Sequence, residues 1–233
     1  MTSPPLTAAG PSAAALDHGV TLAGEHVRLC AERALFWPAQ ATLFVADVHL
    51  GKAAAFRAGG VPLPRGSTQA DLARLQAVLA RTAARRLIVL GDFLHARSGR
   101  VPALADAFKA WRAAQAHVEV VLVRGNHDDH AGDPPPDWNV RVVAEPHLVA
   151  PFIACHLPAT PPTGYALCGH LHPGAMLTGF GDERARLPCF VLGARRAILP
   201  AFGSFTGLAI VPSAPGERRV VIAGSRLFAL PER

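Results

Sequence analysis

The sequence is poor in cysteine, in charged residues and in long hydrophobic runs. Its four cysteines are scattered and form no CxxC pair: Cys30, Cys155, Cys168 and Cys189. This spacing argues against a closed, cysteine-rich zinc site. Four cysteines in a chain of this size predict buried free thiols in a reducing compartment, so we expect a cytoplasmic protein.

No hydrophobic run reaches the length of a membrane span, because Arg, Asp, His or Pro interrupts every candidate. Residues 1–15 are rich in Pro, Ala and Ser, but they have neither a basic start nor a sustained apolar block. This segment predicts a flexible N-terminal tail and not a secretory signal.

Charged residues make up 17% of the chain and hydrophobic residues 50%, a composition that argues against disorder. The length of 233 residues suits one domain with a substantial core, which we expect at residues 16–233. The net charge of +6 favours phosphate-bearing partners such as nucleic acid. A GC-rich genome would explain the many arginines equally well.

The first half of the chain alternates strands with helices. Short strand-like pieces at 20–22, 26–30 and 35–37 precede apolar runs that predict buried strands at 41–46, 86–90 and 118–123. Apolar residues at three- and four-residue spacing predict a helix at 67–85, and a second helix is expected at 102–115. This order predicts right-handed crossovers and parallel pairing.

The second half consists of short apolar segments separated by turns. They predict strands at 140–143, 147–155, 165–168, 189–192, 197–199, 208–211 and 220–222. Together the two halves predict an α/β fold in which two mixed β-sheets pack face to face with helices outside.

Residues with metal-binding side chains follow several of these strands, where ligands gather in parallel sheets. Asp47 and His49 are two positions apart, and in an extended segment both would reach one metal ion; His170 and His172 repeat the spacing. Two carboxylates, one amide and four imidazoles would hold two neighbouring ions with positions open for water and substrate. The proposed metal ligands are Asp47, His49, Asp92, Asn126, His156, His170 and His172.

Two divalent ions about 3.5–4 Å apart suit phosphoryl chemistry, because they activate a bridging water as hydroxide and neutralise charge on the phosphoryl oxygens. His127 adjoins the proposed ligand Asn126 and would point toward substrate, where it could protonate the leaving oxygen as a general acid. Asp128 could hold the His127 ring, or it could stabilise the turn.

The five motifs Asp-x-His, Gly-Asp, Gly-Asn-His-Asp, a lone His and Gly-His-x-His occur in this order between Asp47 and His172. Their order resembles the calcineurin-like metallophosphoesterase superfamily. The resemblance implies a four-layer metallophosphoesterase fold and two metal ions. It implies that Asp47, His49 and His172 bind the first ion and Asn126, His156 and His170 the second. Asp92 would bridge the two ions, with His127 as the catalytic histidine.

Further segments resemble the bacterial ligase-associated DNA damage response endonucleases, the PdeM group. The segments that carry this resemblance are Asp47–Lys52, Phe56-Arg57 with Gly60 and Pro64, Gly91–His95, Gly169–Pro173 and Pro200–Gly207. The resemblance implies a manganese-dependent DNA endonuclease in DNA repair, with a DNA ligase and a helicase as possible partners. Residue 157 departs from the group, because it is a leucine where an acidic residue would be expected.

Three hypotheses about function remain open at this point. The first is the metal-dependent DNA phosphodiesterase, and the second is a phosphatase or a phosphodiesterase that acts on small nucleotides or other phosphoesters. The third is a metal-free interaction module on the same scaffold, which would be expected to lack some of the ligands. His95, near Asp92, and His130, near His127, could support the residues of the site or bind phosphate, or could simply be packed side chains. Lys52 and Arg57 could contact a nucleic-acid backbone, or could simply be solvated.

Overall fold

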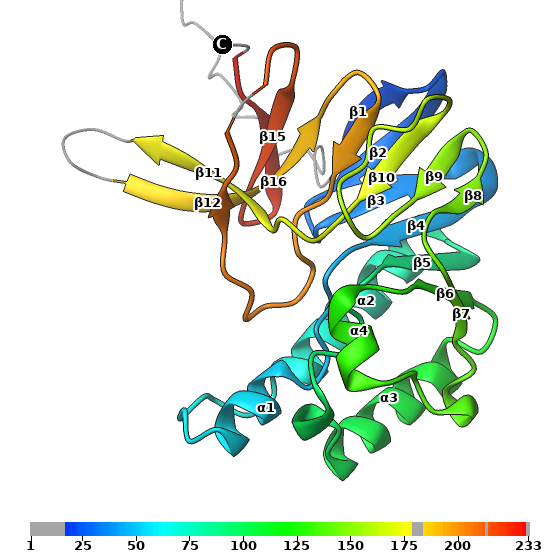
Figure 1. The fold of residues 1–233 in the computed structure, drawn as a ribbon, viewed down its shortest axis with the longest axis vertical. Helices are drawn as coiled ribbons and strands as arrows, with labels where there is room; N and C mark the ends of the chain where they lie inside the picture. Colours follow the sequence, from blue (N-terminus) through cyan, green and yellow to red (C-terminus); the bar gives the residue numbers. More distant parts are fainter. Residues whose placement is uncertain (1–16, 179–183, 213, 232–233) are drawn as a thin grey trace, which may run out of the picture.

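The computed structural model describes residues 17–178, 184–212 and 214–231. They form two mixed β-sheets with helices, which confirms the predicted fold class (Figure 1). The tail predicted at residues 1–15 lies outside the described residues. In the described part of the chain, no helix combines the length and the apolarity that a membrane crossing requires.

The first sheet has seven strands in the order of the chain, of which the first four pair antiparallel and the last four pair parallel. The parallel part confirms the pairing predicted from the alternation of strands and helices. The strands are β1 (Asp17–Leu22), β2 (Glu25–Cys30), β3 (Ala34–Trp37), β4 (Thr42–Val45), β5 (Arg86–Leu90), β6 (Glu119–Val123) and β7 (Arg141–Val143).

The helices connect the parallel strands and gather in the lower half of Figure 1, away from the upper strands of the second sheet. The α-helices are α1 (Lys52–Ala58), α2 (Ser67–Thr82), α3 (Pro102–Ala114) and α4 (Asn126–Ala131), and short 3-10 turns occupy Pro38–Gln40, Arg97–Gly99 and Pro136–Trp138. The sequence analysis missed α1 and α4, because neither short segment has a repeating apolar face.

The second sheet has nine strands and a more mixed topology. The prediction of one strand at 147–155 is wrong: the segment is an antiparallel hairpin in which Val149 pairs with Phe152. The strands are β8 (His147–Val149), β9 (Phe152–Ala154), β10 (Tyr165–Cys168), β11 (Pro173–Thr178), β12 (Arg184–Leu192), β13 (Arg196–Ile198), β14 (Ala209–Ile210), β15 (Arg218–Ala223) and β16 (Arg226–Ala229).

Alternating side chains of the parallel strands fill two cores. In β5, Leu87 and Val89 pack under the helices, whereas Ile88 and Leu90 join the core between the sheets. Both faces of these strands are therefore covered, which explains why their sequences are continuous apolar runs. The core between the sheets draws residues from both, and this supports the proposal that residues 16–233 form one domain.

The four cysteines are free and buried, as their scattered positions predicted. Near the site the two sheets are joined by the backbone: the amide of Phe202 donates to the carbonyl oxygen of Ala46 at 2.7 Å. The end of β4 is therefore held from both sheets, at the point where the first metal-binding motif begins.

Candidate active site

The seven predicted ligands all follow the carboxyl ends of strands. Asp47 and His49 come after β4, Asp92 after β5 and Asn126 after β6. From the second sheet, His156 follows β9, and His170 and His172 follow β10. Because the strand ends of both sheets meet here, side chains more than a hundred residues apart come together in one place, as the sequence analysis expected.

The first group of ligand atoms comes from Asp47, His49 and His172, all within 4.8 Å of one another. The Nε2 atom of His172 lies 3.4 Å from Nε2 of His49 and 3.5 Å from Oδ1 of Asp47. The first group therefore combines ligand atoms from both sheets, close enough together to bind one ion.

The second group comes from Asp92, His156 and His170, with ligand atoms within the same limit. The Nε2 atom of His156 lies 3.1 Å from Nδ1 of His170 and 2.8 Å from Oδ1 of Asn126. Asn126 thus adds a carbonyl oxygen to the two imidazoles and the carboxylate.

Asp92 lies between the two groups. Its Oδ2 atom is 3.8 Å from Nε2 of His49 in the first group, and its Oδ1 atom is 3.4 Å from Nε2 of His156 in the second. One carboxylate therefore offers one oxygen to each group, which is the arrangement that a bridging ligand requires.

The spacing of these atoms fits metal coordination. Ligand atoms roughly 2.1 Å from one ion, at right to tetrahedral angles, are about 3.0–3.4 Å apart. The ring contacts of 3.1 and 3.4 Å lie in this range. The Nδ1–H group of His156 donates to the carbonyl oxygen of Leu90 at 3.1 Å, which leaves its Nε2 lone pair facing the group.

Burial also shifts the pKa values of the side chains in the site. Asp47, His49, Asp92 and His156 are buried. Burial lowers the pKa of both His49 and His170, so these rings are neutral at pH 7, the form that binds metal. Burial raises the pKa of Asp92, because its negative charge is poorly solvated there. A divalent cation between the groups would offset that cost.

Five of the seven predicted ligands have a positive backbone φ angle: Asp47 (54°), His49 (50°), Asp92 (53°), His170 (71°) and His172 (46°). Such angles are uncommon outside glycine and cost of the order of 1–3 kcal/mol each, and they cluster at functional sites. The expectation that His170 and His172 reach the same ion is wrong in this geometry, because the segment is not extended and the two rings join different groups.

His127 stands at the edge of the two groups. Its Nδ1–H group donates to the carbonyl oxygen of His95 at 2.9 Å, and its backbone N–H donates to Oδ1 of Asp92 at 2.9 Å. Its Nε2 atom is 4.0 Å from Oδ2 of Asp92, and its side chain is 37% exposed. The free ring nitrogen therefore lies beside the bridging carboxylate and remains accessible to a substrate.

A family model described as calcineurin-like phosphoesterase matches residues 41–173, which is more than half of the chain and spans every predicted ligand. The chain belongs to the calcineurin-like phosphoesterase family. The superfamily resemblance is thereby confirmed, and the protein is a metal-dependent phosphoesterase.

One solved structure, the nuclease MPE of Pseudomonas putida, is 42% identical to this phosphoesterase. The similarity covers 92% of this chain and 100% of that one, with a TM-score of 0.80. A second structure, the phosphoesterase Yfce of E. coli, is 18% identical over 78% of this chain and 88% of the other, and its TM-score is 0.35. No curated protein sequence matches the chain.

Asp128 of this phosphoesterase is buried, and its side-chain hydrogen bonds go to the backbone and not to the His127 ring. Its two carboxylate oxygens accept hydrogen bonds of 3.0 Å from the backbone amides of Leu94 and Gly125. The carboxylate therefore ties the loop after β5 to the start of α4. Of the two roles that the sequence left open, these contacts correspond to the turn-stabilising one, and the His95 carbonyl holds the ring instead.

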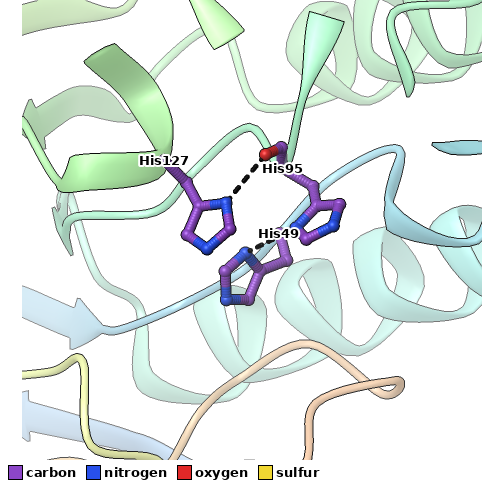
Figure 2. Close-up of side chains that lie close together, drawn as sticks. All are labelled: His49, His95 and His127. Atoms are coloured by element: carbon purple, nitrogen blue, oxygen red, sulfur yellow. Dashed lines mark hydrogen bonds between the residues drawn. The ribbon is translucent and has the colours of Figure 1, made fainter. Parts of the chain in front are cut away.

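His95 contacts both a predicted ligand and the predicted general acid (Figure 2). Its Nδ1 atom lies 3.4 Å from Nδ1 of His49, and its ring stacks on the His127 ring with a centroid distance of 4.8 Å. Burial, with the nearby charges of Lys52 and His127, lowers its pKa to about 4. The sequence analysis placed His95 near Asp92 and left a supporting role open, but it could not show which side chains His95 contacts.

Glu145 was missed entirely by the sequence analysis. Its carboxylate accepts hydrogen bonds from the backbone amides of His156 at 2.6 Å and Leu157 at 3.0 Å. An acidic group therefore lies beside position 157, although the residue at that position is leucine. The only sequence signal is the single charge at the turn before β8, which by itself indicates nothing about the site.

Proposed function

We propose that this phosphoesterase is a manganese-dependent DNA phosphodiesterase that cleaves within DNA strands. The observation that carries the proposal is the pair of ligand groups joined by Asp92, with an unligated imidazole, His127, at their edge. The similarity over nearly the whole chain to a protein described as a nuclease supports a nucleic acid as substrate.

Each predicted ligand has a place in this proposal. Asp47, His49 and His172 would hold one ion, Asn126, His156 and His170 would hold the other, and Asp92 would contact both. Two divalent ions there would activate a water molecule and neutralise charge on the phosphoryl oxygens. Oxygen and imidazole ligands together fit several divalent metals, and manganese is proposed on the PdeM-group resemblance.

In this mechanism the doubly protonated ring of His127 donates its Nε2 proton to the leaving oxygen and is left neutral, with its remaining proton on Nδ1. The hydrogen bond from Nδ1–H to the His95 carbonyl holds the ring in one orientation. The backbone bond to Asp92 keeps the ring next to the group that contacts both ions. Asp128 acts indirectly: its hydrogen bonds from the backbone amides of Leu94 and Gly125 fix the turn that carries His127.

The biological setting is proposed on the PdeM-group resemblance alone. In it the enzyme acts in DNA repair in the cytoplasm, beside a DNA ligase and a helicase. The free buried thiols agree with a reducing compartment.

The experiment is a substrate and metal panel with the purified protein. Supercoiled plasmid and single-stranded DNA are incubated with Mn²⁺, Mg²⁺, Zn²⁺ or Ni²⁺, beside a cyclic nucleotide, a mononucleotide and a simple phosphomonoester. We expect DNA cleavage with Mn²⁺ and none in an Asp92→Asn variant, which excludes a contaminating nuclease.

Two other outcomes would contradict the proposal. Intact DNA beside rapid cleavage of a nucleotide or phosphomonoester would identify the small-phosphoester enzyme, the alternative that the sequence left open. Inactivity on every substrate, with no metal detected by elemental analysis after incubation with Mn²⁺, would support the metal-free interaction module.

A further inference from the structure

Three aromatic rings form a stack that leads from His127 to the protein surface. The His95 ring stacks on His127 with centroids 4.8 Å apart and planes inclined by 23°. On α1, the ring of Phe56 stacks on His95 with centroids 5.9 Å apart and planes inclined by 13°. Each ring is therefore stacked on the next.

Phe56 is one of three phenylalanines in the described part of the chain, with Phe205 and Phe228, whose rings are exposed. It is 39% exposed, whereas six other phenylalanines are fully buried: Phe44, Phe93, Phe108, Phe152, Phe190 and Phe202. An exposed aromatic ring beside an active site offers a flat apolar surface, and every nucleobase has a π-face that can stack on such a ring.

The helix that carries Phe56 is firmly held. It begins directly after the segment with Asp47 and His49, and a Cβ atom at Gly51 would lie only 2.5 Å from the carbonyl oxygen of Gly99. The guanidinium of Arg57 also donates to the carbonyl oxygens of Leu63 at 3.4 Å and Pro64 at 3.1 Å. The ring is therefore presented in a preorganised position.

A cation lies on the same face of α1. Lys52 precedes Phe56 by four residues, so the two side chains are neighbours on the helix surface. In the described part of the chain, no ion pair joins the Lys52 ammonium group to a carboxylate. Burial lowers the pKa of Lys52, and the negative charges of Asp92 and Asp47 oppose this shift. The Lys52 ammonium group can therefore bind a phosphate while the Phe56 ring stacks on the base of the same nucleotide.

From this arrangement we propose that Phe56 is the stacking platform for an unpaired nucleobase of single-stranded DNA, on the leaving-group side of the scissile phosphate. The inference rests on the proposed DNA-cleaving function. The side is set by His127: this residue protonates the leaving oxygen, so the nucleotide that carries that oxygen lies next to it. The ring stack continues from there to Phe56. A base held within a duplex would present only its edge, so the platform favours single strands.

The test compares three substitutions at one position. Phe56→Leu keeps apolar cover on His95 but removes the aromatic face, Phe56→Ala removes both, and Phe56→Trp restores a larger aromatic face. On single-stranded DNA with Mn²⁺ we expect kcat/KM to fall roughly 5- to 150-fold in the Leu and Ala variants, and to stay near the wild-type value in Phe56→Trp. Melting temperature and manganese content are measured for each variant, to detect any general damage.

An abasic residue provides the matched control in the substrate. In oligonucleotides with one abasic residue on either side of a mapped cleavage position, we expect the wild-type rate to fall only for the leaving side. With that substrate the ratio of wild-type to Phe56→Leu rates should approach one, because the stacking partner is already missing.

The outcomes separate this inference from the proposed function. If the wild type cuts no DNA, the proposed function fails. If the wild type cuts single-stranded DNA and Phe56→Leu is equally fast, the stacking inference alone is wrong. An equal loss in Phe56→Leu on intact and abasic DNA would also overturn it, since Phe56 would then act only by supporting His95.

Discussion

The Nδ1 atom of His95 lies 3.4 Å from the Nδ1 atom of His49, so a residue outside the predicted ligand set contacts a predicted ligand through its ring. A metal-binding Nε2 atom on His49 must be unprotonated, and the proton then resides on Nδ1 and is donated to His95. Such outer contacts fix the tautomer and the orientation of a ligand ring.

This contact predicts that His95→Ala lowers Mn²⁺ affinity about 10- to 100-fold. His95→Asn should recover part of the loss, because its side-chain oxygen can take the place of Nδ1 as acceptor. Titration with Mn²⁺ followed by calorimetry measures both variants. Wild-type affinity in His95→Ala would show that the contact has no role in metal binding.

The lowered pKa of His95, about 4, predicts a pH-dependent difference in stability between the metal-free wild type and His95→Asn. An unfolded histidine has a pKa of about 6.5, so between pH 6.5 and 4 the unfolded chain binds more protons at this position. The stability contribution of His95 is therefore lost as the pH falls through this window. Urea unfolding with EDTA should show His95→Asn gaining stability relative to the wild type from pH 7 to pH 4, and an unchanged difference would contradict the prediction.

Asp92 offers one oxygen to each ligand group, so Asp92→Ala should abolish metal-dependent turnover and reduce the bound metal at both positions. Elemental analysis after incubation with Mn²⁺ measures the bound metal. Asp106→Ala, at an exposed position on α3, is the matched control and should behave as wild type. Two ions retained by Asp92→Ala would contradict a bridging role.

His127→Ala should slow hydrolysis roughly 100- to 10,000-fold while sparing metal binding, because the ring donates a proton and lies at the edge of the groups. The loss should be small with p-nitrophenolate, a leaving group that needs little protonation, and large with an alkoxide. Steady-state kinetics on both classes of diester measures the contrast. Wild-type rates on the alkoxide substrate would exclude the general-acid role.

Asp92 leaves no space for a side chain at Gly125. A Cβ atom there would lie 2.5 Å from both the amide nitrogen and Oδ1 of Asp92. We expect Gly125→Ala to destabilise the protein by about 1–3 kcal/mol and to weaken metal binding by displacing that carboxylate. At Gly19, in β1, nothing lies within 4 Å of an added Cβ atom, so Gly19→Ala is the control. Urea unfolding and Mn²⁺ titration compare the two, and equal behaviour would contradict the prediction.

The ligand set could be foreseen because each ligand follows an apolar strand. Three apolar runs end just before Asp47, Asp92 and Asn126, and parallel strands bring such ends to one edge. The pairing of His170 with His156 and of His172 with His49 was implied only by family resemblance. Two-residue spacing alone suggested the right arrangement for Asp47 and His49, which share a group, but the wrong one for His170 and His172. All four residues have positive φ angles, so the spacing in an extended segment is no guide to where their side chains point.

The sequence by itself determined the strands of the first sheet, the two longer helices and the side chains that reach the edge of the sheets, because apolar periodicity and strand ends are local properties of the chain. Only the tertiary structure decided the supporting contacts: His95 on His49 and His127, Glu145 on His156, and Phe56 on His95. These partners lie 11 to 46 residues apart in the chain and on different elements. Their meeting depends on how the elements pack, for which no local pattern of residues provides a signal.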